Sequence, residues 1–202
     1  MKKAVKIIVV LVIILLVAIG SLLTYVKVAL PRVGDAPEIK IEATPERLER
    51  GKYLASHVAV CIDCHSVRDW SKLAGPIDHN KLASGGERFD QTMGLPGVYY
   101  SPNITPFNLK DWTDGEIFRT ITTGVTKEGK ALFPIMPYPR YAQMDKEDIY
   151  SIIAYIRTLP VIETKDLPES KSDFPMNFII NTIPKEADLK PMPPANNQIA
   201  YG

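Results

Sequence analysis

The sequence predicts an all-α domain behind a single N-terminal transmembrane helix. Three observations support this fold class: residues 7–26 form an uncharged apolar run, residues 44–160 contain three segments with capping residues and helical spacing, and the two cysteines fall in one short motif. A chain of 202 residues suffices for one domain with appendages. We therefore divide it into an anchor (1–27), a tether (28–43), the domain (44–160) and a C-terminal extension (161–202).

The apolar run of residues 7–26 is 20 residues long, the length of a helix that crosses a bilayer. Lys2, Lys3 and Lys6 precede it, which predicts that the N-terminus stays in the cytoplasm. A cleaved signal peptide is the alternative, with "AIGS" at 18–21 as a poor cleavage site. The length of the run favours a retained, single-pass anchor.

The charge balance of the remaining chain argues against nucleic acid as a partner. Residues 28–202 carry 20 basic and 23 acidic side chains, so no strong basic surface is expected. The segment 28–43 contains Pro31, Gly34 and Pro37 and is predicted to be a tether between the membrane and the domain.

Two helices are predicted from their first residues. Thr44 is an N-cap with Pro45 at the first helical position, and the helix that follows leads into the cysteine motif. Thr113 and Glu116 have the spacing of a capping box, and Gly124 is expected to end that second helix.

The third helix has the clearest pattern and spans residues 145–159. Asp145 caps it, isoleucines repeat on one face, and Pro160 ends it. Residues 161–202 contain six prolines and little periodicity, so we expect an extension with a mobile final stretch. Within it, residues 174–180 are apolar enough to pack on another surface.

The cysteine motif reads Cys61-Ile62-Asp63-Cys64-His65, the C-x-x-C-H pattern of c-type haem attachment. Residues three apart share a helix face, so both thiols can hold one porphyrin edge while His65 reaches the iron. A thioredoxin-like thiol pair would require a βαβ setting, which the pattern lacks. Half of a zinc site would require further paired ligands, and only His57 and His79 remain. One motif predicts one covalent haem c.

Met136 is the candidate for the second axial ligand of the iron. It lies in "ALFPIMPYPRY", residues 131–141, where prolines stiffen the backbone and Pro137 favours an extended Met136. Such a loop can present a thioether to haem iron, although a methionine that only fills the core is the alternative. His79 would instead give a bis-histidine site. The competing methionines are Met93, Met144 and Met176.

Five segments in order carry a family resemblance: "RGKYLA…CIDCHS", "YYSPNITP", "WTDGEIFRTITTGV", "ALFPIMPY" and "IIAYIRTLP". Over roughly residues 47–160 the chain resembles membrane-associated class I cytochromes c, above all the haem domains of cytochrome subunits of membrane-bound alcohol and sugar-acid dehydrogenases. The resemblance implies the class I cytochrome c fold around one covalent haem. It also implies axial ligation by His65 and Met136. Those subunits commonly carry three haem motifs, whereas this chain has one.

The same resemblance implies further haem contacts. Pro76 stands where such proteins place a carbonyl that accepts the imidazole N–H of His65. Asn103 and Trp112 lie in segments that edge the haem, and Tyr138 is a candidate for contact with a propionate.

The implied function is that of a membrane-tethered mono-haem cytochrome that passes single electrons between respiratory partners. These partners would be a dehydrogenase, a quinol-oxidising complex or a terminal oxidase, with no small-molecule substrate and no catalysis of its own. Covalent haem attachment resembles the periplasmic maturation route, so we expect the domain on the periplasmic side of a bacterial inner membrane. The alternatives are a fixed subunit of a dehydrogenase or oxidase complex, and a haem sensor or enzyme with an open sixth position.

Overall fold

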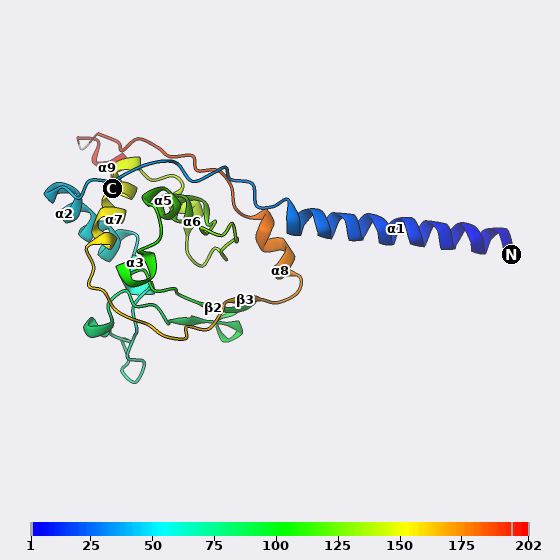
Figure 1. The fold of residues 1–202 in the computed structure, drawn as a ribbon, viewed down its shortest axis with the longest axis horizontal. Coiled ribbons are helices and arrows are strands. Elements are labelled where there is room, and N and C mark those ends of the chain that lie inside the picture. Colours follow the sequence, from blue (N-terminus) through cyan, green and yellow to red (C-terminus); the bar gives the residue numbers. More distant parts are fainter. Residues whose placement is uncertain (1, 195, 202) are drawn as a thin grey trace.

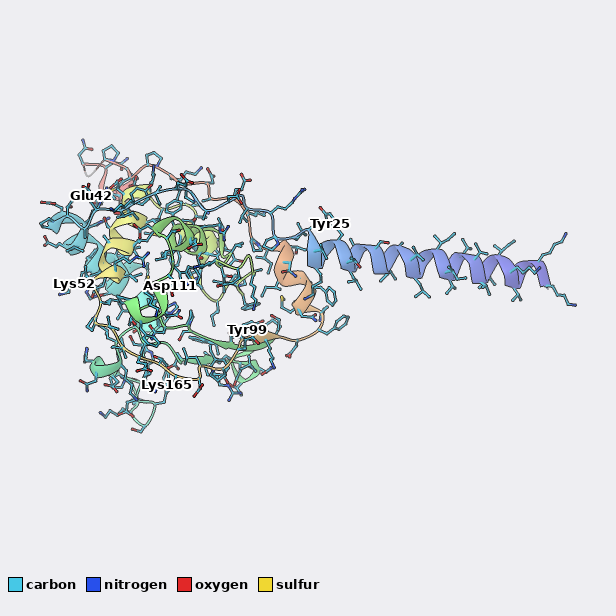
Figure 2. The ribbon with its side chains drawn as sticks, in the orientation of Figure 1. Tyr25, Glu42, Lys52, Tyr99, Asp111 and Lys165 are labelled. Carbon is cyan, nitrogen blue, oxygen red and sulfur yellow. The ribbon has the colours of Figure 1, made fainter. Side chains whose placement is uncertain are left out.

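A long helix, α1 (Lys2–Val28), projects from one end of a helix-rich domain (Figure 1). The structure is a computed structural model and describes residues 2–194 and 196–201. No residue of α1 is buried, and most of the helix projects clear of the domain, while its C-terminal end lies beside α8 (Figure 2). Among the described residues, α1 is the one helix long and apolar enough to cross a bilayer, a criterion that a signal sequence near the N-terminus also meets. The predicted apolar helix is therefore present as a candidate membrane span.

Four helical segments enclose the apolar core of the domain. They are α2 (Pro45–Tyr53), the π-helical turn η1 (Leu54–Val58), α5 (Asp114–Thr123) and α7 (Lys146–Arg157). α2 packs tightly on α7, because a Cβ atom on Gly51 would lie 1.9 Å from the carbonyl oxygen of Ser151. Only glycine permits this approach. The isoleucine face of α7 is buried in the core, as the pattern predicts: Ile149, Ile152, Ile153 and Ile156.

The predicted capping residues begin all three long helices of the domain. The side chains of Thr44 and Asp145 each accept a hydrogen bond from a first-turn N–H. Thr113 and Glu116 form the reciprocal capping box, with N–H···O distances of 2.7 and 3.1 Å. Gly124 ends α5 with a φ of 73°, the left-handed conformation that glycine adopts without steric cost. These local predictions are confirmed.

A small antiparallel sheet departs from the predicted all-α class. Its strands β1 (Arg88–Phe89), β2 (Gly97–Tyr100) and β3 (Lys171–Ser172) pair in the order β1-β2-β3. The strands are short and β3 lies far along the chain, so the sequence has no alternating pattern that predicts them. The remaining elements are also short: α3 (Cys61–Cys64), η2 (His79–Lys81), η3 (Gln91–Met93), α4 (Pro106–Leu109), α6 (Tyr138–Tyr141), α8 (Met176–Ile179), η4 (Ile180–Thr182) and α9 (Gln198–Tyr201).

The segment predicted as a tether lies on the domain surface. Residues 29–43 form no regular element, but the N–H of Ile41 donates to the Asp114 carboxylate at 2.8 Å. Pro37 lies directly over α5, since a Cβ atom on Gly115 would be 1.8 Å from its carbonyl oxygen. The linker is therefore attached to the domain along part of its length.

The proline-rich extension also packs on the domain. Its strand β3 completes the sheet, and the N–H of Met192 donates to Asp145 at 2.9 Å. Between these points α8 lies against the domain end of α1 (Figure 1). The extension thus contacts the sheet, α7 and the anchor helix.

Candidate haem site

Six of the eight predicted site residues line one cavity of about 530 Å³. They are Cys61, Cys64, His65, Asn103, Trp112 and Met136. The walls come from α3, β2, α5, the proline-rich loop before α6, and the C-terminal extension. The volume falls within the range of roughly 300–1,000 Å³ typical of cofactor pockets, and the lining is mostly apolar.

The cysteine motif forms the single helical turn α3 at the edge of this cavity. Val60 immediately before it has a φ of 47°, a strained conformation for a β-branched residue that turns the chain sharply into the motif. The N–H of His65 then bonds to the carbonyl of Cys61 at 2.9 Å, which places both cysteines on one turn. Burial raises the pKa of Cys61 to about 12 and also raises that of Cys64, so both thiols are protonated at neutral pH.

The ring of His65 is fixed by a hydrogen bond to the carbonyl oxygen of Pro102, with Nδ1 and the oxygen 2.8 Å apart. A carbonyl oxygen only accepts, so Nδ1 carries the proton and Nε2 keeps its lone pair. Burial lowers the pKa of His65, which favours this neutral ring. The prediction that Pro76 makes this contact is wrong: its carbonyl accepts from the N–H of Asp69 at 2.9 Å instead.

Pro102 is held in place by its neighbours. The N–H of Gly85 donates to the His65 carbonyl at 2.7 Å, and a Cβ atom on Gly85 would lie 2.5 Å from the carbonyl carbon of Pro102. The buried side chain of Asn103 donates to the Ile162 carbonyl at 2.8 Å and to the Thr164 hydroxyl at 3.0 Å. The Gly85-Gly86 pair in the sequence signals a close backbone approach, but not which segment approaches.

Met136 lies on the same cavity and packs partly against the core. The N–H of Tyr138 bonds to the Met136 carbonyl at 2.7 Å around Pro137, whose φ of −78° and ψ of 49° describe an inverse γ-turn. A loop is therefore present around Met136, as the prolines predict. Within the described residues, the alternative ligands Met93, Met144, Met176 and His79 do not line the cavity.

Tyr138 does not line the cavity, so its predicted contact with a propionate is not supported. Its side chain is 2% exposed, and a Cβ atom on Gly124 would lie 2.4 Å from its ring. Burial raises the pKa of Tyr138 to about 12. A different tyrosine, Tyr141, lines the cavity and donates its hydroxyl to the Ala59 carbonyl at 2.6 Å.

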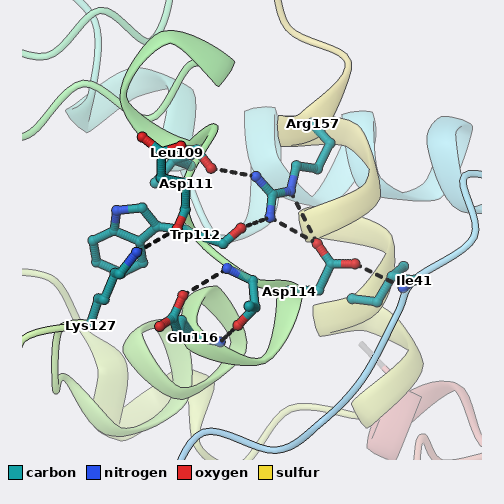
Figure 3. Close-up of polar contacts among 9 residues, drawn as sticks. Ile41, Leu109, Asp111, Trp112, Asp114, Glu116, Lys127 and Arg157 are labelled. Carbon is teal, nitrogen blue, oxygen red and sulfur yellow. Dashed lines mark hydrogen bonds and ion pairs between the residues drawn. The ribbon is translucent and has the colours of Figure 1, made fainter.

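A network around Arg157 supports the wall that contains Trp112 (Figure 3). The guanidinium donates to the carbonyls of Leu109 at 2.6 Å and Trp112 at 2.5 Å, and it pairs with the Asp114 carboxylate at 3.0 Å. The other carboxylate oxygen of Asp114 accepts the N–H of Ile41. Arg157 thus joins α7 to α5 and the turn before it, and Asp114 extends the network to the linker.

The residues present fit a c-type haem. An apolar cavity suits the porphyrin, two thiols three residues apart suit its vinyl edge, and a neutral imidazole with a free Nε2 suits the iron. In residues 2–194 and 196–201, no three His, Cys, Asp or Glu side chains are grouped to hold a metal ion, which gives the zinc alternative no support.

The comparisons point to the same class of protein. The chain is 26% identical over 171 residues to "Alcohol dehydrogenase (quinone), cytochrome c subunit" of Gluconacetobacter polyoxogenes, covering 80% of this chain and 34% of that relative. It is 33% identical over 118 residues to "Gluconate 2-dehydrogenase cytochrome c subunit" of Pantoea cypripedii, covering 56% of this chain and 23% of that relative. It is 33% identical over 137 residues to "Fructose dehydrogenase cytochrome subunit" of Gluconobacter japonicus, covering 66% of this chain and 25% of that relative.

These relatives are cytochrome subunits of dehydrogenases, as the resemblance implied. The chain spans about a third or less of the length of each. No family model matches the chain.

Proposed function

We propose that this protein is a membrane-tethered c-type cytochrome with one haem that carries single electrons to or from a dehydrogenase complex. The observation that carries the proposal is the meeting of Cys61, Cys64, His65 and Met136 on one apolar cavity. The similarity to cytochrome subunits of dehydrogenases supports the electron-transfer role.

Each residue has a distinct task in this proposal. Cys61 and Cys64 hold the haem through thioethers, and His65 offers Nε2 to the iron while Pro102 fixes its ring. The hydrogen bond to Pro102 makes the imidazole a stronger donor. Met136 would supply a thioether from a loop whose backbone the prolines restrict, so little conformational entropy would be lost on ligation. When bound, the haem would supply Fe(III)/Fe(II) electron transfer, and ligation by both His65 and Met136 would leave no position on the iron for a substrate.

Covalent attachment is the first test. Haem should stay with the chain after acid-acetone extraction and denaturing electrophoresis. Replacing Cys61 or Cys64 by alanine should weaken retention, and replacing both should abolish it. Free extraction of haem from the unmodified protein would refute the proposal.

Axial ligation by Met136 is tested separately. Met136→Ala should retain covalent haem but lose the near-infrared sulfur-to-iron charge-transfer band, bind CO faster and show a lower midpoint potential. Met144→Ala is the matched control, because Met144 packs against the core without lining the cavity. If the control loses the band and Met136→Ala keeps it, the assignment of the sixth ligand is incorrect.

The membrane arrangement is also part of the proposal: α1 stays attached, with its N-terminus in the cytoplasm and the domain in the periplasm. Protease added to spheroplasts should then degrade the domain, and the mature N-terminus should not lie near Ser21. Affinity purification from native membranes should recover a dehydrogenase subunit in stoichiometric amount if the protein is a fixed subunit. Recovery without such a partner would favour a mobile carrier.

A further inference from the structure

The C-terminal extension returns to the point where the anchor helix meets the domain. Lys27, in the last turn of α1, donates from Nζ to the Asn177 carbonyl at 2.7 Å. The same ammonium group lies 4.9 Å from the centre of the Phe178 ring. In Figure 1, α8 lies beside this end of α1 and runs across its direction.

This meeting point is at the level where the bilayer should end. The uncharged run of α1 stops at Val26, and Lys27 is the first charged residue after it. Tyr25, which Figure 2 shows at the domain end of α1, is of the residue type that anchors spans at the interface. The length of the run matches the hydrocarbon thickness, so in a bilayer crossed by α1, Lys27 and the α8 backbone bonded to it would lie among lipid headgroups.

Two large apolar side chains are exposed within three residues of that hydrogen bond. Phe174 is 79% exposed and Ile179 is 44% exposed. The ring of Phe174 makes an edge contact with Phe178, with 6.4 Å between ring centres. Aromatic and aliphatic side chains next to a cationic one are the composition that favours the membrane interface.

We propose that residues 174–180 form a second membrane contact, in which Phe174 and Ile179 enter the boundary between headgroups and acyl chains while Lys27 faces lipid phosphates. The occupant of this apolar surface is the lipid bilayer, because the surface continues the helix that crosses it. The inference rests on the proposed membrane span of α1.

The contact would fix the orientation of the domain on the membrane. Ile180 follows Ile179 directly and lines the haem cavity, and Ser172 of β3 lines it as well. A segment held at the lipid surface on one side therefore forms a wall of the cavity on the other. A single span alone would leave the domain free to rotate about the helix end.

The test uses the full holo-protein in nanodiscs of phosphatidylethanolamine and phosphatidylglycerol, with one chain per disc so that a second copy cannot cover the surface. Phe174→Cys and Ile179→Cys would each receive a nitroxide label, and collision with oxygen and with a water-soluble nickel complex would be measured. The parent chain should take no label, since both native cysteines are in thioethers in the holo-protein. Leu15→Cys in α1 is the lipid reference. Val161→Cys is the water reference, because Val161 is 69% exposed and follows shortly after α7, which Figure 1 shows on the side of the domain away from α1.

We expect the ratio of oxygen to nickel accessibility at positions 174 and 179 to be shifted from the value at 161 towards the value at 15. The double variant Phe174→Asp/Ile179→Asp should also reduce the linear dichroism of the haem in oriented bilayers, whereas Val161→Asp should not. A ratio at 174 and 179 equal to that at 161, with a lipid-like ratio at 15, would overturn the second contact alone. A water-like ratio at 15 would overturn the membrane span as well.

Discussion

Arg157 joins three parts of the chain, and its replacement by lysine tests how far this network supports the cavity wall. Lysine keeps the positive charge but presents a single ammonium group in place of the planar fork. It can satisfy the Asp114 carboxylate or one carbonyl, but it cannot reproduce the bonds to Leu109, Trp112 and Asp114 together. The other acceptors would lose their charge-assisted partner.

The expected decrease in the free energy of unfolding follows from the hydrogen bonds that Arg157→Lys removes. A hydrogen bond to a charged group contributes about 1.5–3 kcal/mol, and an acceptor left unpaired costs about 1–3 kcal/mol. The Arg157 side chain is 26% exposed, so water can reach part of the network and the loss is reduced. We expect Arg157→Lys to lower the free energy of unfolding by about 2–4 kcal/mol.

The assay is urea denaturation of the detergent-solubilised holo-protein, followed by far-ultraviolet circular dichroism. Arg47→Lys is the matched control, because Arg47 pairs with Glu147, whose side chain is 62% exposed, and donates to one backbone carbonyl, that of Glu42. An exposed pair of this kind contributes about 0–1 kcal/mol. The Soret dichroism of Arg157→Lys should also change, since Trp112 and Leu109 line the cavity. Equal stabilities of the two variants with an unchanged Soret signal would refute the role assigned to Arg157.

Two glycine substitutions test the close backbone contacts. Gly85→Ala combines a positive φ with a Cβ atom 2.5 Å from Pro102, so stability should fall by about 2–5 kcal/mol in thermal unfolding. If the holo-protein is still recovered, its midpoint potential should rise, because a weaker bond from His65 to Pro102 makes the imidazole a poorer donor to Fe(III); an unchanged potential would count against that role. Gly115→Ala should displace Pro37 and speed proteolysis of the linker without altering the haem spectrum, and an intact linker at the parental rate would show that the contact is not required.

Local signals explain what the sequence could predict. The caps Thr44, Thr113 and Asp145 act within three residues of their partners, so their geometry depends little on the rest of the fold. The C-x-x-C-H motif is equally local. The prolines predicted a loop around Met136, although not the γ-turn at Pro137.

Contacts between segments that are far apart in the chain explain why the sequence could not predict the rest of the site and the sheet. His65 and Pro102 are 37 residues apart, and they meet only because Gly85 allows the two backbones to approach. Pro76 was predicted from its place eleven residues after His65, whereas the carbonyl that contacts the His65 ring belongs to Pro102. Strand β3 pairs with a strand about 75 residues earlier over two residues, too short for a periodic pattern.

The C-terminal extension connects the membrane level to the cavity within a few residues. Asn177 is bonded to Lys27 at the end of the candidate span, and Ile180, three residues later, lines the cavity. Three residues in helical conformation advance about 4.5 Å, so this wall lies within about one helical turn of the level at which α1 would leave the bilayer. The linker is attached as well, through Ile41 and Asp114. In the proposed membrane arrangement, the span, the linker and the extension would together restrict the domain, which would keep one side of the cavity close to partners in the same membrane and raise their effective concentration there.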